Sequence, residues 1–230
     1  MKLKLKVKRG NDSEVRYDTF EVEVQEGMTF LRALQMIKED VDPTLTFRQF
    51  CRAGICGTCA ITINGFPKLS CREQVLPYAM MGEEVVLEPL DRFPVIRDLA
   101  VDSSQMITEM KKLRTWISGF SGDVRIPPEL SKKIERSADC ILCLACQSHC
   151  PQMLEEDYAG PLYFAKLYRF LEDPRDDEGL MRLKVAVEEG NLYHCLSCNK
   201  CNNVCPKEVE PATLIRELMT YTDIDGKGKE

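Results

Sequence analysis

The first part of the chain alternates polar and apolar positions with the period of two that β-strands require. Residues 2–8 alternate lysine with leucine or valine, and residues 20–24 alternate apolar residues with glutamate. Successive side chains of a strand point to opposite faces, so each run predicts a strand with one buried face and one solvent-exposed face. One strand carries lysine on that face and the other carries glutamate, so pairing them gives favourable cross-strand charge pairs. Gly10-Asn11-Asp12 supplies turn residues between the two runs.

A helix and further short strands complete this pattern. Thr29 is a suitable N-cap for a helix that Pro43 would end, because its hydroxyl can accept from a free backbone N–H group. The helix carries one apolar stripe, formed by Phe30, Ala33, Leu34 and Ile37. Strands are predicted at residues 60–63, closed by the turn pair Asn64-Gly65, and at residues 84–87. This order of elements predicts a small β-grasp domain over residues 1–102.

From residue 103 onward the apolar positions change to helical spacing. Apolar stripes with spacings of three and four residues predict helices at 106–117, from Pro161 to Asp173, at 180–187 and at 211–219. A loop over 118–128, which includes Ser121, Gly122, Pro127 and Pro128, interrupts them, and residues 225–230 resemble a frayed polar tail. The predicted fold class is therefore α+β, with an all-α domain over residues 103–230 after the β-grasp domain.

Composition narrows the class of protein. The 230 residues are 44% hydrophobic and 30% charged, which is enough apolar material for folded cores. The formal net charge is −6, so the sequence does not predict the positively charged surface that nucleic-acid binding requires. We expect a cytoplasmic protein, because no apolar run approaches the roughly 18 residues of a membrane span and the first ten residues contain no signal-like apolar segment.

The twelve cysteines fall into three groups, and the first has a specific spacing. Cys51, Cys56 and Cys59 follow C-x4-C-x2-C, and Cys71 comes later in the chain. This is the plant-type ferredoxin spacing, in which four thiolates hold a [2Fe–2S] cluster. Zinc is the alternative metal, but a four-residue gap between cysteines is poor for a zinc finger.

The other two groups each follow C-x2-C-x2-C-x3-C-P, the run of bacterial ferredoxins. They comprise Cys140, Cys143, Cys146 and Cys150, and then Cys195, Cys198, Cys201 and Cys205. In two-cluster ferredoxins the fourth cysteine of each run ligates the other cluster. That rule predicts one [4Fe–4S] cluster on Cys140, Cys143, Cys146 and Cys205. It places Cys195, Cys198, Cys201 and Cys150 around a further cluster.

Together these groups resemble the iron–sulfur subunit of succinate dehydrogenases and fumarate reductases. The likeness is carried by CRAGICGTC at 51–59, RDLAVD at 97–102 and CILCLAC at 140–146, and it covers nearly the whole chain. It implies an electron-transfer subunit without bond chemistry of its own, working at the succinate–fumarate step of the tricarboxylic acid cycle. Its implied partners are an FAD-containing flavoprotein subunit and a membrane-anchor subunit, which would hold it at the inner face of the cytoplasmic membrane.

Two positions depart from typical quinone-linked members of that family. There the last centre is [3Fe–4S], and an apolar residue stands where this chain has Cys198. By analogy Cys150, Cys195 and Cys201 are ligands in either case. Cys198 would complete a [4Fe–4S] cluster, because it restores the full spacing of a cluster run. The alternative is a free buried thiol beside a three-iron cluster.

The second departure concerns the electron acceptor. Well-known quinone-linked members place tryptophan shortly after the first Cys-Pro, where this chain has residues 152–155 as Gln-Met-Leu-Glu, and some have histidine where it has Leu196. The differences count against direct quinone binding and favour a cysteine-rich, heterodisulfide-reductase-like partner. Two other functions stay open: the iron–sulfur subunit of a different flavin-dependent oxidoreductase, and a free-standing polyferredoxin that carries electrons.

Overall fold

The computed structural model of this chain describes residues 1–82, 84–119, 125–155 and 157–226. The chain divides into two compact units. The first unit consists of residues 1–103 and 141–148, and the second of residues 104–140 and 149–230. The domain boundary predicted after residue 102 stays a prediction. In the structure, residues 141–148 also belong to the first unit.

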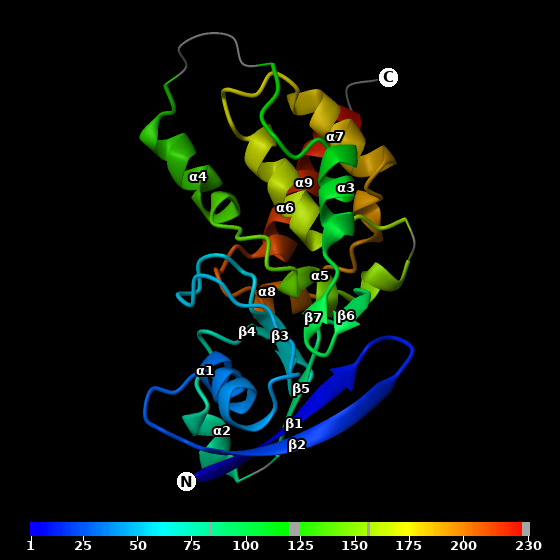
Figure 1. The fold of residues 1–230 in the computed structure, drawn as a ribbon. Coiled ribbons are helices and arrows are strands. Elements are labelled where there is room, and N and C mark those ends of the chain that lie inside the picture. Colours follow the sequence, from blue (N-terminus) through cyan, green and yellow to red (C-terminus); the bar gives the residue numbers. More distant parts are fainter. Residues whose placement is uncertain (83, 120–124, 156, 227–230) are drawn as a thin grey trace. The chain divides into compact units, whose positions relative to one another are not determined.

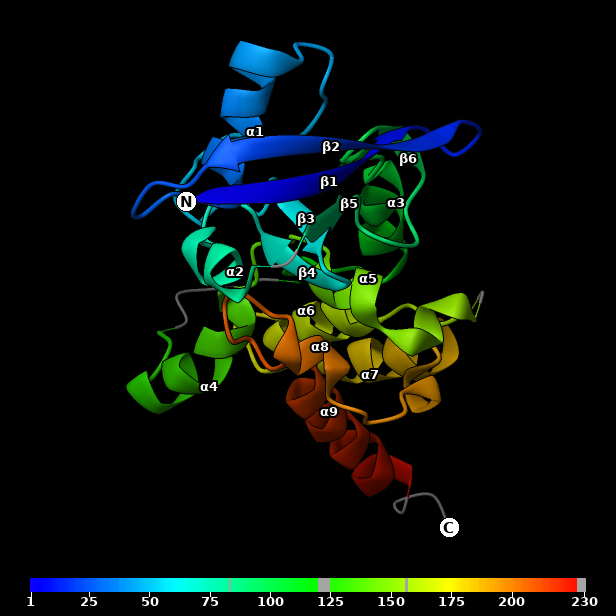
Figure 2. The ribbon, with the colours of Figure 1, turned by 90° about the horizontal axis from the view of Figure 1, so that it is seen from below.

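A five-stranded sheet forms the frame of the first unit (Figure 1). Its order is β2-β1-β5-β3-β4, with β1 and β5 parallel and the other neighbours antiparallel. Figure 2 shows the two long strands β1 and β2 side by side along one edge. The strands are β1 (Lys2–Gly10), β2 (Val15–Glu23), β3 (Ala60–Ile63), β4 (Phe66–Leu69) and β5 (Val85–Glu88).

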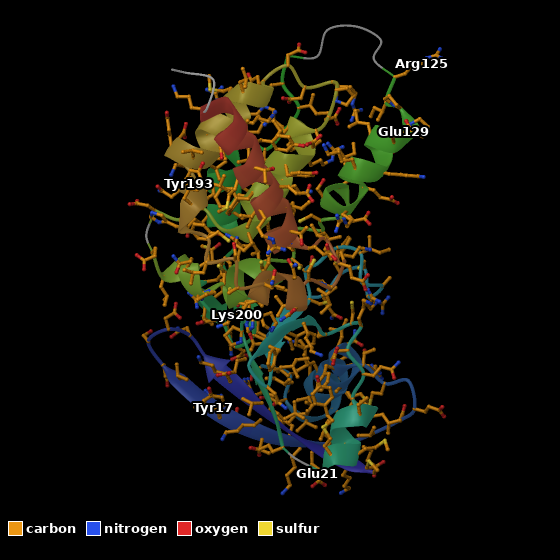
Figure 3. The ribbon with its side chains drawn as sticks, turned by 180° about the vertical axis from the view of Figure 1, so that it is seen from behind. Tyr17, Glu21, Arg125, Glu129, Tyr193 and Lys200 are labelled. Atoms are coloured by element: carbon orange, nitrogen blue, oxygen red, sulfur yellow. The ribbon has the colours of Figure 1, made fainter. Side chains whose placement is uncertain are left out.

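The β1–β2 hairpin has the charge pairing that the alternating pattern predicts. Lys2 lies opposite Glu23 and Lys4 opposite Glu21, and the Lys2 ammonium pairs diagonally with Glu21 Oε1 at 2.5 Å. Both partners are solvent-exposed, so water and salt screen the pair and it adds little to stability. Glu21 and Tyr17 are labelled on β2 in Figure 3. The predicted strands are confirmed, and β2 begins five residues earlier than its alternating run.

The predicted helix is confirmed as α1 (Phe30–Met36), continued by one wider π-type turn at Ile37–Val41. Thr29 caps it, since its hydroxyl oxygen accepts from the Arg32 N–H at 3.3 Å. The apolar stripe of α1 is buried in the core of the sheet. The sequence did not predict four further elements of the first unit: β4, α2 (Leu76–Met81), β6 (Val95–Arg97) and β7 (Ala100–Val101).

The second unit is helical, as predicted. In it α6 packs against α4, α7 and α9, and its inner side chains, from Leu162 to Tyr168, are nearly all buried. Its longer helices are α3 (Ser104–Lys112), α4 (Pro128–Ala138), α6 (Pro161–Leu171), α7 (Gly179–Glu188) and α9 (Pro211–Gly226). The shorter elements are α5 (Ala145–His149), which spans both units, η2 (Pro151–Leu154), η3 (Leu192–His194) and α8 (Lys200–Asn203).

Helix ends in this unit differ from the predicted ones. The 106–117 stripe is only partly helical, because α3 stops at Lys112. Helix α9 extends to Gly226, so the predicted polar tail begins inside a helix, and residues 227–230 lie outside the described residues. Ser121 and Gly122 of the predicted loop also lie outside them, while Pro128 opens α4 at a position where proline fits well. In the described ranges we find no helix with both the length and the apolar character of a membrane span.

Candidate metal centres

The first cysteine group lies in a loop that aims backbone N–H groups at sulfur. The N–H groups of Ala53, Ile55 and Cys56 lie 3.3–3.4 Å from Cys51 Sγ, and Gly54 N–H donates to Cys71 Sγ at 3.3 Å. The three N–H groups next to Cys51 Sγ lower the pKa of Cys51 to about 6, and that of Ala53 contributes most. Several N–H groups converging on cysteine sulfur stabilise thiolates, the form that ligates iron. The donor set of this loop therefore fits a cluster.

The loop needs backbone conformations that favour glycine. Gly54 and Gly57 have φ of 68° and 72°, and Arg52, at 56°, is also left-handed. A Cβ on Gly57 would lie 2.8 Å from Ile141 O and 2.9 Å from Cys143 Cα, both in the same unit. The bare Cα of Gly57 thus lets the first cysteine loop lie directly against the segment that carries Cys143.

We expect Gly57→Ala to destabilise the first unit by more than the strain of a left-handed alanine, which costs roughly 1–2 kcal/mol. Gly65→Ala is the matched control, because Gly65 has a similar φ of 80° but nothing within 4 Å of its added Cβ. Thermal unfolding followed by circular dichroism compares the two variants. Equal losses would show that the close approach at Gly57 carries no cost.

Asp98, which is part of the RDLAVD motif, anchors the segment that precedes the first cysteine loop. Asp98 Oδ1 accepts from Gly10 N–H and its Oδ2 from Thr46 N–H, both at 2.8 Å. Arg9, which is 1% exposed, forms an ion pair with Asp98 at 3.2 Å and further pairs with Asp18 and Asp42. The Leu99 N–H also donates to Thr46 O. This buried carboxylate therefore ties the chain just before Cys51 to strand β1.

The second and third cysteine groups share one backbone pattern. Leu142 and Leu144 in the second, and Ser197 and Asn199 in the third, have φ between 51° and 66° at equivalent places relative to their cysteines. Residues other than glycine adopt this left-handed conformation in only a small share of cases, and a bulky leucine does so only where the surrounding structure enforces it. The repetition supports the internal repeat seen in the sequence. The four ligands predicted for the middle cluster, Cys140, Cys143, Cys146 and Cys205, are divided between the two units, and this set stays a prediction.

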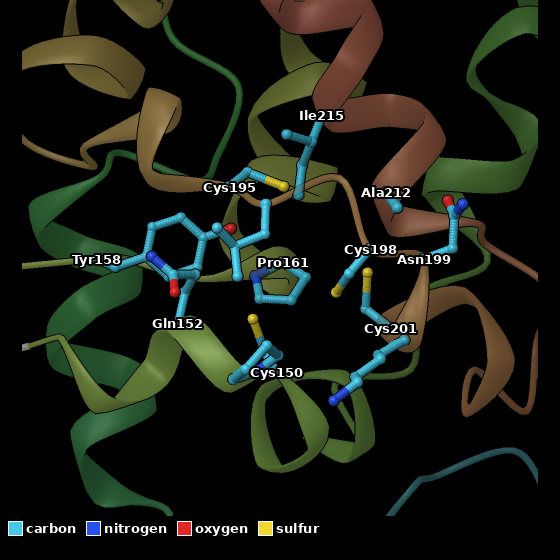
Figure 4. Close-up of a pocket in the computed structure, with 13 residues that line it drawn as sticks. Cys150, Gln152, Tyr158, Pro161, Cys195, Cys198, Asn199, Cys201, Ala212 and Ile215 are labelled. Carbon is cyan, nitrogen blue, oxygen red and sulfur yellow. The ribbon is translucent and has the colours of Figure 1, made fainter.

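The four cysteines of the last predicted set lie together inside the second unit. They line one small pocket. In Figure 4 their sulfur atoms point into the same space. Apolar side chains make up much of the remaining wall, and Tyr158, which the sequence did not single out, also lines it. The four residues are Cys150, Cys195, Cys198 and Cys201.

Burial differs sharply within this set. Cys150 is 8% exposed and Cys201 is 6% exposed, whereas Cys198 is solvent-exposed, which corrects the alternative of a buried free thiol. Burial, followed by the neighbouring thiols of Cys150, Cys195 and Cys198, raises the pKa of Cys201 to about 12. Thiols this close resist ionising together unless a positive centre compensates their charge. The set fits a cationic iron core.

Two family models match the chain. The model of a 2Fe-2S iron-sulfur cluster binding domain matches residues 4–108, and the model of a 4Fe-4S dicluster domain matches residues 136–209. The matches contain the first cysteine group and the two later groups, respectively.

Relatives from archaea and bacteria cover most of the chain. It is 36% identical over 227 residues to a subunit of the fumarate reductase (CoM/CoB) of Methanothermobacter marburgensis, covering 97% of this chain and 44% of that protein. The chain spans less than half the length of this and two other archaeal relatives. It is 34% identical to the fumarate reductase iron-sulfur subunit of Mycobacterium tuberculosis, covering 89% of this chain and 85% of that protein.

A solved structure shows the same fold. A chain of the "Mycobacterium smegmatis Sdh1 complex in the apo form" superposes with a TM-score of 0.85 at 28% identity. The superposition covers 96% of this chain and 95% of that one. The likeness therefore extends over both units and is not confined to the cysteine motifs.

Proposed function

Because the chain belongs to the family of iron–sulfur subunits of succinate dehydrogenases and fumarate reductases, we propose that it carries electrons between a flavoprotein and a second redox partner. It is an oxidoreductase component with a 2Fe-2S domain and a 4Fe-4S dicluster domain. Bound clusters supply one-electron transfer, and the chain supplies their ligands, spacing and surroundings.

The proposed ligand sets follow the cysteine spacing. The [2Fe–2S] cluster is held by Cys51, Cys56, Cys59 and Cys71, and the [4Fe–4S] cluster by Cys140, Cys143, Cys146 and Cys205. The last cluster is held by Cys150, Cys195, Cys201 and, as its fourth ligand, Cys198. The observation that carries this proposal is the convergence of four sulfurs on one pocket in the second unit. The N–H donors to Cys51 and Cys71 support the first set in the same way.

The flavoprotein is the proposed source or acceptor of electrons at the succinate–fumarate end. At the other end we favour a cysteine-rich, heterodisulfide-reductase-like subunit over a quinone. Two features support this choice: the relative whose name pairs fumarate reductase with CoM/CoB, and the sequence Gln152–Glu155, which lacks the tryptophan of quinone-linked members. Through such subunits the chain would lie at the inner face of the cytoplasmic membrane.

Purification of the intact complex from its native cells tests these partners. We expect a protein with bound FAD to co-purify, and the complex to reduce fumarate with a viologen dye as donor. A complex that reduces a different substrate would assign the chain to another flavin-dependent oxidoreductase. A monomer with all its clusters and no flavin would instead mark a free electron carrier.

Changing Cys71 to serine should perturb the [2Fe–2S] signal alone. Oxygen is a harder and weaker ligand for iron than thiolate, so the cluster's EPR spectrum and potential should shift or the cluster should be lost. EPR of the anaerobically purified and reduced protein measures the change, and the signals of the other two clusters serve as internal controls. A response in those clusters would contradict the proposed grouping of the cysteines.

A further inference from the structure

Tyr158 has a buried hydroxyl without a hydrogen-bond partner among the residues that the structure describes. The residue is 3% exposed and lines the pocket of the last cysteine set. Buried tyrosine hydroxyls normally find a partner, because leaving one unpaired costs about 1–3 kcal/mol. An orphaned donor at the wall of a ligand pocket indicates that its acceptor belongs to whatever the pocket binds.

The ring of Tyr158 is held firmly in place. It packs on Phe164, with ring centroids 5.6 Å apart and an angle of 46° between the planes. The next residue, Ala159, donates its N–H to Gly190 O at 3.1 Å, which fixes the backbone. The hydroxyl therefore has little freedom to turn away toward solvent.

The surroundings of the hydroxyl identify its acceptor as sulfur. Pro161, Ala212 and Ile215 form apolar wall, and the cysteine thiols supply polarisable atoms within the same space. Cys150 and Cys195 line the same pocket as Tyr158. Burial raises the pKa of Tyr158, and these two thiols raise it further. Cys195 also acts on this hydroxyl as a weak side-chain partner, but no hydrogen bond that meets the usual geometric limits forms.

We propose that Tyr158 donates a hydrogen bond to a sulfur of the last cluster, on its Cys195 side, and thereby raises the reduction potential of that cluster. The inference rests on the ligand set proposed above. A reduced cluster carries more negative charge on its sulfurs, so a hydrogen bond to sulfur stabilises the reduced form more than the oxidised form. Tyr158 keeps its proton while one electron arrives from the preceding centre and leaves to the partner.

Tyr158→Phe tests the proposal, because phenylalanine keeps the packing on Phe164 and removes only the hydroxyl. In the complete protein with its clusters, we expect about a tenfold weaker preference for the reduced form of the last cluster. For a one-electron couple this is a potential lower by about 59 mV. An EPR-monitored redox titration measures it, and the other two clusters should keep their potentials.

Tyr168→Phe is the matched control. Tyr168 is also buried, but its hydroxyl interacts with Glu217 and it does not line the pocket. Its loss should leave the potential of the last cluster unchanged. An unchanged potential in Tyr158→Phe would overturn this inference alone. A wild-type protein without the signal of a last cluster would overturn the ligand set as well.

A second measurement needs no stable variant. ENDOR spectroscopy of the wild-type protein, in the paramagnetic state of the last cluster, should detect one exchangeable proton coupled to it that is not from a backbone N–H group. Incorporating tyrosine deuterated on its ring should change the couplings of the neighbouring ring protons. A cluster without any tyrosine coupling would contradict the proposed hydrogen bond.

Discussion

Replacing Cys198 with valine is expected to lower the iron content from about ten to about nine atoms per chain, because a [4Fe–4S] cluster becomes a three-iron cluster. Valine offers no ligand, and the three remaining thiols of Cys150, Cys195 and Cys201 suffice for three iron atoms. The oxidised variant should then show a sharp EPR signal near the free-electron g value. Anaerobic iron and sulfide analysis of the same sample measures the lost iron.

Leu196→Val is the control for this experiment. Leu196 is 61% exposed and lines the same pocket, but it has no group that binds iron. Its variant should keep about ten iron atoms and lack the sharp signal. If Cys198→Val also keeps the wild-type iron count and spectrum, Cys198 is a free thiol. A wild-type protein that already shows the three-iron signal leads to the same conclusion.

Asp98→Ala is expected to destabilise the first unit by about 3–5 kcal/mol, the range found when one partner of a buried ion pair is removed. The change leaves the N–H groups of Gly10 and Thr46 without their acceptor and removes one carboxylate from the buried Arg9. Thermal unfolding should shift down by roughly 2–4 °C per kcal/mol for a chain of this size. The [2Fe–2S] EPR signal should also broaden, because the segment before Cys51 loses its anchor.

Asp18→Ala separates this anchoring role from a general loss of charge around Arg9. Asp18 also pairs with Arg9, but its side chain is 32% exposed and it fastens no backbone of the cysteine loop. We expect a loss of less than about 1 kcal/mol and an unchanged EPR line shape. Similar effects from the two variants would count against Asp98 as an anchor of the loop.

Much of the fold could be predicted from local patterns. The β1–β2 hairpin, α1 and β3 follow from period-two alternation, a threonine cap and turn pairs, all of which act over a few residues. In contrast, β7 comprises only Ala100 and Val101, too short to show any period, and it exists because it pairs with β6. Helix α9 continues to Gly226, and its end could not be predicted because the residues after Met219 carry no clear apolar stripe.

The candidate sites also combine features that the local sequence predicts with features that only the tertiary fold creates. Cysteine spacing is a local property, so the ligand sets could be proposed from the sequence alone. The roles of Asp98 and Tyr158 depend on the tertiary fold. Asp98 meets Gly10 and Thr46 across 88 and 52 positions of sequence, and the hydroxyl of Tyr158 matters only because the fold buries it beside distant cysteines. No spacing rule connects such residues.

The interleaving of the two units has a consequence for how the protein is made. The first unit includes residues 141–148, and its cysteine loop lies against that segment at Gly57. At a synthesis rate of roughly 5–20 residues per second, the ribosome needs about 2 to 9 seconds to pass from residue 103 to residue 148. Throughout this time the nascent β-grasp sheet can form, but the side of the cysteine loop next to Gly57 stays uncovered. Co-translational folding thus leaves an interval in which the first cysteine loop is accessible to the machinery that delivers its cluster.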